Sequence, residues 1–164
     1  MALKYYKRAL KINPENDEVC RELAYCFKES DTYKEAEAYL KKALKINPDN
    51  DGVYRDLGFL FKEQGKYKEA EVCFNKAIDI DPKNDLAYSG LASCFKDQNE
   101  LESAIKYFQK ALEINPENDE IYRELAYSCV EQGKYIESEK YFQKALEINQ
   151  DDEWNYIRLA YCFT

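Results

Sequence analysis

The sequence predicts an all-α solenoid of stacked antiparallel helix pairs, and three observations support this prediction. Proline occurs only four times, each 34 residues after the last: Pro14, Pro48, Pro82 and Pro116. A fixed period between about 20 and 50 residues is the signature of a repeat array. Each period contains two segments in which apolar or small residues recur at helical spacing, a pattern that is typical of amphipathic helices. Each repeat is therefore expected to be a pair of helices.

The repeat boundaries follow from the text around each proline. The segment Ala-Leu-Lys-Ile-Asn-Pro-Glu-Asn precedes Asp17, and close variants of it precede the same position of later repeats. We predict a single array in 1–164, with a leading second helix and a final first helix that lack their partners. Its parts are the half repeat 1–16, the full repeats 17–50, 51–84, 85–118 and 119–152, and the half repeat 153–164.

About ten helices and no strand are expected, with the leading helix near 2–13 and the last near 153–163. In the first helix of each repeat, one small residue is predicted to be buried where helices meet closely, because a larger side chain would overpack the contact. These residues are Ala24, Gly58, Ala92, Ala126 and Ala160.

Turn and cap residues agree with this division. Gly65, Gly133, Asn99 and Asp31 fall between the two helices of a repeat, where a left-handed conformation is favoured. The residue before each first helix is suited to capping it through its side-chain oxygen. The predicted caps are Asn16, Asn50, Asn84, Asn118 and Asp152.

The spacing and residue types resemble the tetratricopeptide repeat. The second full repeat matches every element of the family's pattern in order, at Tyr54, Leu57, Gly58, Phe61, Gly65, Tyr67, Ala70, Phe74, Ala77 and Pro82. The resemblance covers the whole chain, with mild departures at Cys20, Asn99, Leu101, Cys129, Ser138 and Gln150. It implies a right-handed superhelical solenoid whose first helices line a concave groove for an extended peptide or a partner helix. The family's clamp for acidic chaperone tails is not expected, because its pattern of lysine, asparagine and arginine is not matched from any repeat, and only Arg158 fits it.

Composition excludes several other functions. The net charge of −8 argues against nucleic acid and anionic membranes, and no run is long enough for a membrane span. Without histidine or a nucleotide or nucleophile motif, we expect no catalytic residues, no cofactor and no enzyme activity. No metal site is expected either. We interpret the chain as soluble and cytoplasmic.

Six cysteines are spread along the chain without a Cys-x-x-Cys pair, at 20, 26, 73, 94, 129 and 162. They are expected to be small buried hydrophobes in a reducing compartment, with a disulfide framework or a redox sensor as the alternative. Three of them, Cys26, Cys94 and Cys162, share one repeat position with Leu60 and Ser128, which favours packing.

Candidate groove residues lie at the fifth and ninth positions of the first helices, which share one face. Arginine and aromatic residues there are common in binding hot spots. With neighbours in the last half repeat, the candidates are Arg21, Tyr25, Arg55, Phe59, Ser89, Ser93, Arg123, Tyr127, Trp154, Arg158 and Tyr161. The alternative is that Arg21, Arg55 and Arg123 pair with the Asp four residues earlier, and that the aromatics pack between repeats.

The leading functional hypothesis is a non-catalytic protein-interaction scaffold that binds a protein or peptide. One alternative is an assembly module that associates weakly, head to tail, through its terminal helices. The residues expected at that contact are Ala2, Tyr6, Ala9, Tyr156, Leu159 and Phe163. Another alternative is a scaffold segment of a longer protein whose enzymatic domain lies elsewhere.

Overall fold

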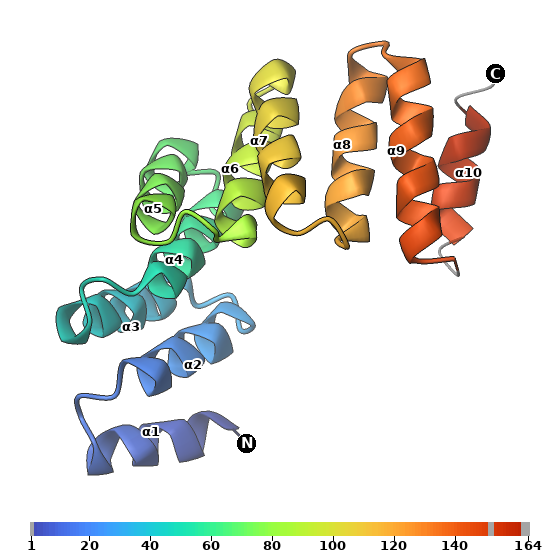
Figure 1. The fold of residues 1–164 in the computed structure, drawn as a ribbon. Helices are drawn as coiled ribbons and strands as arrows, with labels where there is room; N and C mark the ends of the chain where they lie inside the picture. The colour runs from blue at the N-terminus through green and yellow to red at the C-terminus, as the bar shows by residue number, and fades with distance from the viewer. Residues whose placement is uncertain (1, 151–152, 162–164) are drawn as a thin grey trace. The chain divides into compact units, whose positions relative to one another are not determined.

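The computed structural model describes residues 2–150 and 153–161, and within them it contains ten helices and no strand (Figure 1). The chain divides after Pro82 into two compact units. The expected helix content is therefore confirmed for this part of the chain. A single continuous array of all the repeats stays a prediction.

The first unit consists of two and a half repeats. Its helices are α1 (Ala2–Ile12), α2 (Asp17–Lys28), α3 (Tyr33–Ile46), α4 (Asp51–Glu63) and α5 (Tyr67–Ile80). Helices α2 and α3 form one pair and α4 and α5 the next, while α1 packs on α2 and α3 on α4. Each helix therefore packs against the helix that follows it.

The second unit repeats this arrangement. Its helices are α6 (Asp85–Asp97), α7 (Leu101–Ile114), α8 (Asp119–Glu131), α9 (Tyr135–Ile148) and α10 (Glu153–Tyr161). The pairs are α6 with α7 and α8 with α9, and α7 packs on α8 and α9 on α10. None of the described helices is long and apolar enough to cross a membrane.

The turns within repeats adopt the left-handed conformation that the sequence predicts. Gly65 and Gly133 have φ of 69° and 73°, and Asp31 and Asn99 have φ of 54° and 64°. Glycine adopts this conformation without steric cost, and Asn and Asp tolerate it best among the other residues. The backbone therefore reverses at the same position in all four repeats.

The predicted asparagine caps are confirmed at all four described positions. The side chains of Asn16, Asn50, Asn84 and Asn118 each accept a hydrogen bond from the backbone N–H three residues later. This bond satisfies one of the amide groups that a helix start leaves without a partner. The predicted cap at Asp152 lies outside the described residues.

Asn50 also joins two repeats. Its Oδ1 caps α4 at Val53, while its Nδ2 donates to Asp17 Oδ2 at 2.9 Å. Asn47 donates to the same carboxylate oxygen at 3.3 Å. The hydrogen bond from Asn50, with that from Asn47, lowers the pKa of Asp17 below its usual value. This link therefore stabilises the fold at neutral pH and is lost as the pH falls through the lowered pKa of Asp17.

The core of each repeat lies between its two helices. Phe74, Phe108 and Phe142 are buried, as are the alanines on the same second-helix stripe. The small first-helix residues Ala24, Gly58, Ala92 and Ala126 are buried as predicted.

The prediction for Ala160 is wrong, because this residue is exposed. Ala126 is covered because α8 packs against α9, the second helix of the same repeat. Helix α10 has no such second helix within the described residues.

The cysteines are confirmed as free thiols in the described part of the chain. Cys20, Cys94 and Cys129 are fully buried, and Cys26 and Cys73 are half-buried. Burial raises the pKa of Cys73 and of Cys129 to about 11, so both thiols stay protonated at neutral pH. Such thiols are poor nucleophiles, in agreement with a packing role.

Gly58→Leu is expected to lower the free energy of unfolding by roughly 1–3 kcal/mol, because it overpacks the contact between α4 and α5. A Cβ atom at Gly58 would lie only 2.7 Å from Cε1 of the buried Phe74 ring. Urea unfolding followed by circular dichroism measures the loss. The control is Val72→Leu, at a side chain that is 69% exposed. Equal midpoints for Gly58→Leu and the parent would contradict the assignment.

Candidate functional site

The first helices of the first unit hold a cluster of two arginines around one carboxylate. Arg21 on α2 donates from Nε to Asp56 Oδ2 on α4 at 3.0 Å, and its Nη2 lies 2.9 Å from the same oxygen. Arg55 donates to the other oxygen, Oδ1, from Nη2 at 2.9 Å and from Nε at 3.2 Å. The cluster carries a net positive charge, and its side chains are 22–31% exposed.

This arrangement differs from the alternative in which Arg21 pairs with Asp17. The Asp17 carboxylate accepts hydrogen bonds from the amides of Asn47 and Asn50. Arg21 instead reaches the next repeat, because α2 lies beside α4 closely enough for a second cross-repeat pair, Lys28 with Glu63 at 2.7 Å. Asp56 is a site residue that the sequence did not single out. Repeat spacing does not show which side chains of neighbouring first helices meet.

The aromatic residues of the ninth position differ in exposure. Phe59 packs edge-on against Phe74, with ring centroids 5.0 Å apart, and Tyr127 packs edge-on against Phe142 at 5.3 Å. Both contacts lie within one repeat. Tyr25 is 60% exposed, and its repeat has Leu40 in place of that phenylalanine. Tyr25 is therefore the candidate best placed to contact a partner.

The second unit presents a less charged first-helix surface. Ser89 donates from Oγ to the carbonyl of Leu86 at 3.1 Å, and Ser93 and Arg123 are half-buried. Here Lys96 on α6 pairs with Glu124 on α8, so an ion pair again joins neighbouring first helices. The candidates Trp154, Arg158 and Tyr161 lie outside the side chains that the structure describes.

The residues expected at a head-to-tail contact lie on α1 and α10. Tyr6 donates from its hydroxyl to Glu22 on α2 at 3.0 Å and is half-buried, as are Ala9 and Leu159. Ala2 is exposed, and Tyr156 is 55% exposed. Phe163 lies outside the described residues.

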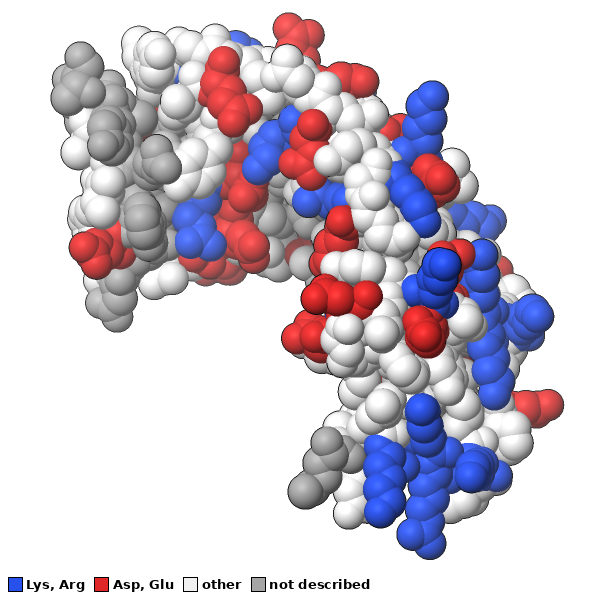
Figure 2. All heavy atoms as spheres, turned by 180° about the vertical axis from the view of Figure 1, so that it is seen from behind, with Lys and Arg blue, Asp and Glu red and all other residues white. Residues whose placement is uncertain are grey.

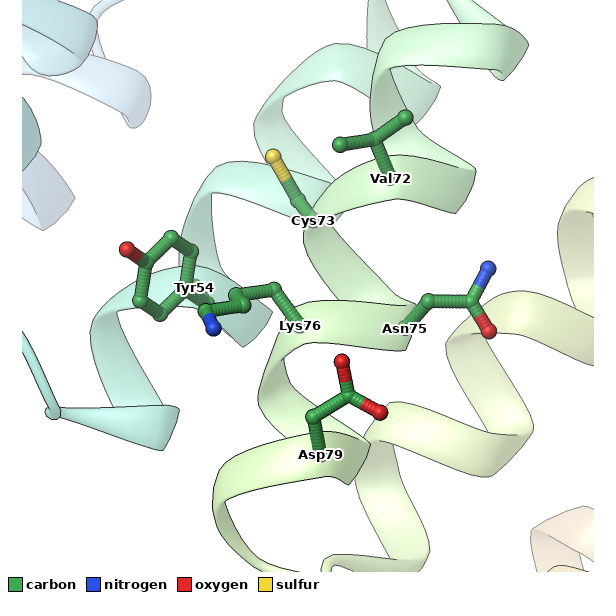
Figure 3. Close-up of a pocket in the computed structure, with 6 residues that line it drawn as sticks. All are labelled: Tyr54, Val72, Cys73, Asn75, Lys76 and Asp79. Atoms are coloured by element: carbon green, nitrogen blue, oxygen red, sulfur yellow. The ribbon is translucent and has the colours of Figure 1, made fainter.

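A hollow that the sequence did not predict lies on the second-helix side of the first unit (Figure 3). It measures about 380 Å³ and is lined by Tyr54 of α4 and by Val72, Cys73, Asn75, Lys76 and Asp79 of α5. None of the predicted groove residues lines it. Among the described residues, no group of three or more His, Cys, Asp or Glu side chains is placed to hold a metal ion.

Helix pairs repeated every 34 residues, with a small residue at each close contact, define an all-α repeat protein. Models of the tetratricopeptide repeat match residues 2–57, 27–94, 86–118 and 119–152. The chain therefore belongs to the tetratricopeptide repeat family, as its sequence predicts, and is a protein-interaction scaffold. Comparison with curated proteins gave no match.

Solved structures share the fold. MamA is 26% identical, with a TM-score of 0.78 over 91% of this chain and 87% of its own. The pilF protein of Pseudomonas aeruginosa is 23% identical, with a TM-score of 0.84 over 96% and 73%. YrrB, described as a TPR protein with an unusual peptide-binding site, is 20% identical, with a TM-score of 0.74 over 96% and 81%.

Asp56→Asn is expected to lower the free energy of unfolding by roughly 1 kcal/mol, because Arg21 and Arg55 lose the charge that they share. The matched control is Glu37→Gln, which removes the half-buried partner of the exposed Lys41 within α3 and should change stability by less than about 0.5 kcal/mol. Urea unfolding of both variants measures the difference. A loss no larger at Asp56 than at Glu37 would mean that the cluster does not stabilise the stacking of α2 on α4.

Proposed function

We propose that the first-helix surfaces bind an extended peptide or a partner helix, with Tyr25 and the Arg21–Asp56–Arg55 cluster as the main contacts. The observation that supports this function is an exposed tyrosine one helical turn from an arginine cluster with a net positive charge. Tyrosine and arginine are enriched among the residues that dominate binding energies. The family provides the scaffold, and these side chains provide the chemistry of recognition.

The cluster favours a ligand with a carboxylate or a row of backbone carbonyls. Each guanidinium group has five N–H donors, so Arg21 and Arg55 together have more donors than the lone pairs of one carboxylate can accept. The remaining donors can serve a ligand while Asp56 holds both side chains in place. Fixing the side chains in advance lowers the entropy cost of binding. YrrB, whose description names a peptide-binding site, supports peptide binding as a use of this fold.

A peptide array tests the proposal. The variant Tyr25→Ala/Arg55→Gln should lose at least about tenfold in affinity for the peptides that the parent binds, since hot-spot truncations cost about 2 kcal/mol or more. The control Tyr135→Ala/Lys68→Gln makes the same kinds of change at exposed residues of α9 and α5. Urea unfolding confirms that both variants fold. Identical binding profiles for the parent and for Tyr25→Ala/Arg55→Gln would contradict the proposal.

End-to-end association is the second candidate function, favoured by the exposure of Tyr156 and Ala160 on α10. The equivalent Ala126 is buried by α9. An apolar contact of this kind depends little on salt, and Tyr156→Glu should abolish it. Sedimentation velocity at about 0.5 M salt, where charge effects are screened, checks this. A parent that stays monomeric there at the highest concentration would rule it out.

A further inference from the structure

Two rows of exposed side chains run along the second helices, outside the proposed peptide-binding surface. They occupy positions four residues apart, which lie on one face of a helix. The first outer row consists of Lys7, Lys41, Asn75, Gln109 and Gln143. The second outer row consists of Lys11, Lys45, Asp79, Glu113 and Glu147. All ten side chains are exposed, so packing does not dictate their identity.

The charge of these rows reverses along the chain. On α1 and α3 both rows are lysine, whereas on α7 and α9 the first row is glutamine and the second is glutamate. The difference extends to whole units: residues 1–82 hold 15 Lys and Arg against 16 Asp and Glu, and residues 83–164 hold 9 against 16. These rows are thus basic on α1 and α3 and acidic on α7 and α9, whereas α5 of the first unit has Asn75 and Asp79 there. On α9, Lys144 pairs with Glu147 and offsets part of the negative charge.

Neighbouring residues reinforce the basic side. Helix α1 contains no acidic residue and adds the exposed Lys4 and Arg8. Figure 2 shows Lys and Arg side chains gathered where α1 lies. On α3, Glu37 pairs with Lys41 at 2.6 Å and offsets part of the charge. Lys11 and Lys45, in the second outer row, are the cations best placed for a partner.

We propose that Lys11 and Lys45 of one molecule bind Glu113 and Glu147 of a second copy. The two lysines are one repeat apart on neighbouring second helices of one unit, and the two glutamates are likewise one repeat apart in the other. The spacing of the cations therefore matches the spacing of the anions. Since both pairs belong to the same chain, a second copy supplies the complementary surface without any other partner.

The contact is weak and sensitive to salt. Its charges are exposed, and ions screen them over a Debye length of about 8 Å at physiological ionic strength. Charge complementarity of this kind speeds encounter and selects the partner more than it adds affinity. The two surfaces differ, so the contact is heterologous. It also differs from the apolar end-to-end contact, which salt leaves intact.

Sedimentation velocity at about 20 mM and about 500 mM salt is the first test, because the Debye length falls severalfold between them. We expect the charge contact to form at the lower salt and to be lost at the higher, where any association left would come from the apolar end-to-end contact. Two charge reversals provide the second test. Lys11→Glu/Lys45→Glu makes both surfaces acidic, and Glu113→Lys/Glu147→Lys makes both basic. Each variant alone should be monomeric at low salt, and an equal mixture of the two should associate.

The matched control is Lys34→Glu/Lys68→Glu, which makes the same charge change at exposed lysines of α3 and α5 outside the outer rows. This control should associate like the parent. Three results would each overturn the proposal: a parent that is monomeric at low salt, an equal mixture of the two reversals that stays monomeric, or a control that dissociates like Lys11→Glu/Lys45→Glu. An association that is equally strong at high salt would mean that apolar residues, and not these charges, make the contact between two copies.

Discussion

The close approach of the two helices of a repeat is the contact on which the rest of this structure depends. In the second full repeat it occurs where Gly58 meets the ring of Phe74, with no room for a Cβ atom unless the ring moves. The next repeat packs Ala92 and Phe108 into one cluster with residues of α8. This contact places the aromatic of the ninth position, Phe59, against Phe74 as well. Helix pairing, the core and part of the candidate site therefore follow from one small residue facing one large residue.

Much of the fold could be predicted from the sequence, because the strict period means that the same local structure recurs in every repeat. The asparagine caps and the left-handed turns act through residues close in sequence, so Asn50 and Gly65 could be interpreted without a structure. Ala160 was misjudged because burial at that position needs a second helix of the same repeat, which α10 lacks within the described residues. The repeat pattern predicts which positions can be buried, and the helices packed beside a position decide whether it is buried.

Side-chain partners in the candidate site were harder to predict. Asp17, four residues before Arg21, is a partner that helical spacing favours, yet Arg21 reaches Asp56, 35 residues away. Two competitors decide this outcome: the asparagine amides occupy Asp17, and the stacking of α2 on α4 brings Asp56 within reach. Both depend on how consecutive first helices stack, which periodicity does not specify. The hollow beside Tyr54 was not predicted either, because it is lined by side chains from both helices of one repeat and periodicity does not specify how these side chains meet.

Charged surfaces vary in this chain where packing sets no requirement. Ala36, Ala70, Ala104 and Ser138 occupy one position of the second helix, and all are fully buried, because the helices pack closely there and only small side chains fit. The outer rows on the same helices are exposed and make only surface contacts, so lysine, asparagine, aspartate, glutamine and glutamate are all compatible with the fold there. The buried residues that stabilise the fold and the exposed residues whose charge varies thus lie on different faces of one helix. Surface charge can then change from repeat to repeat without disturbing the helix pairs that present it.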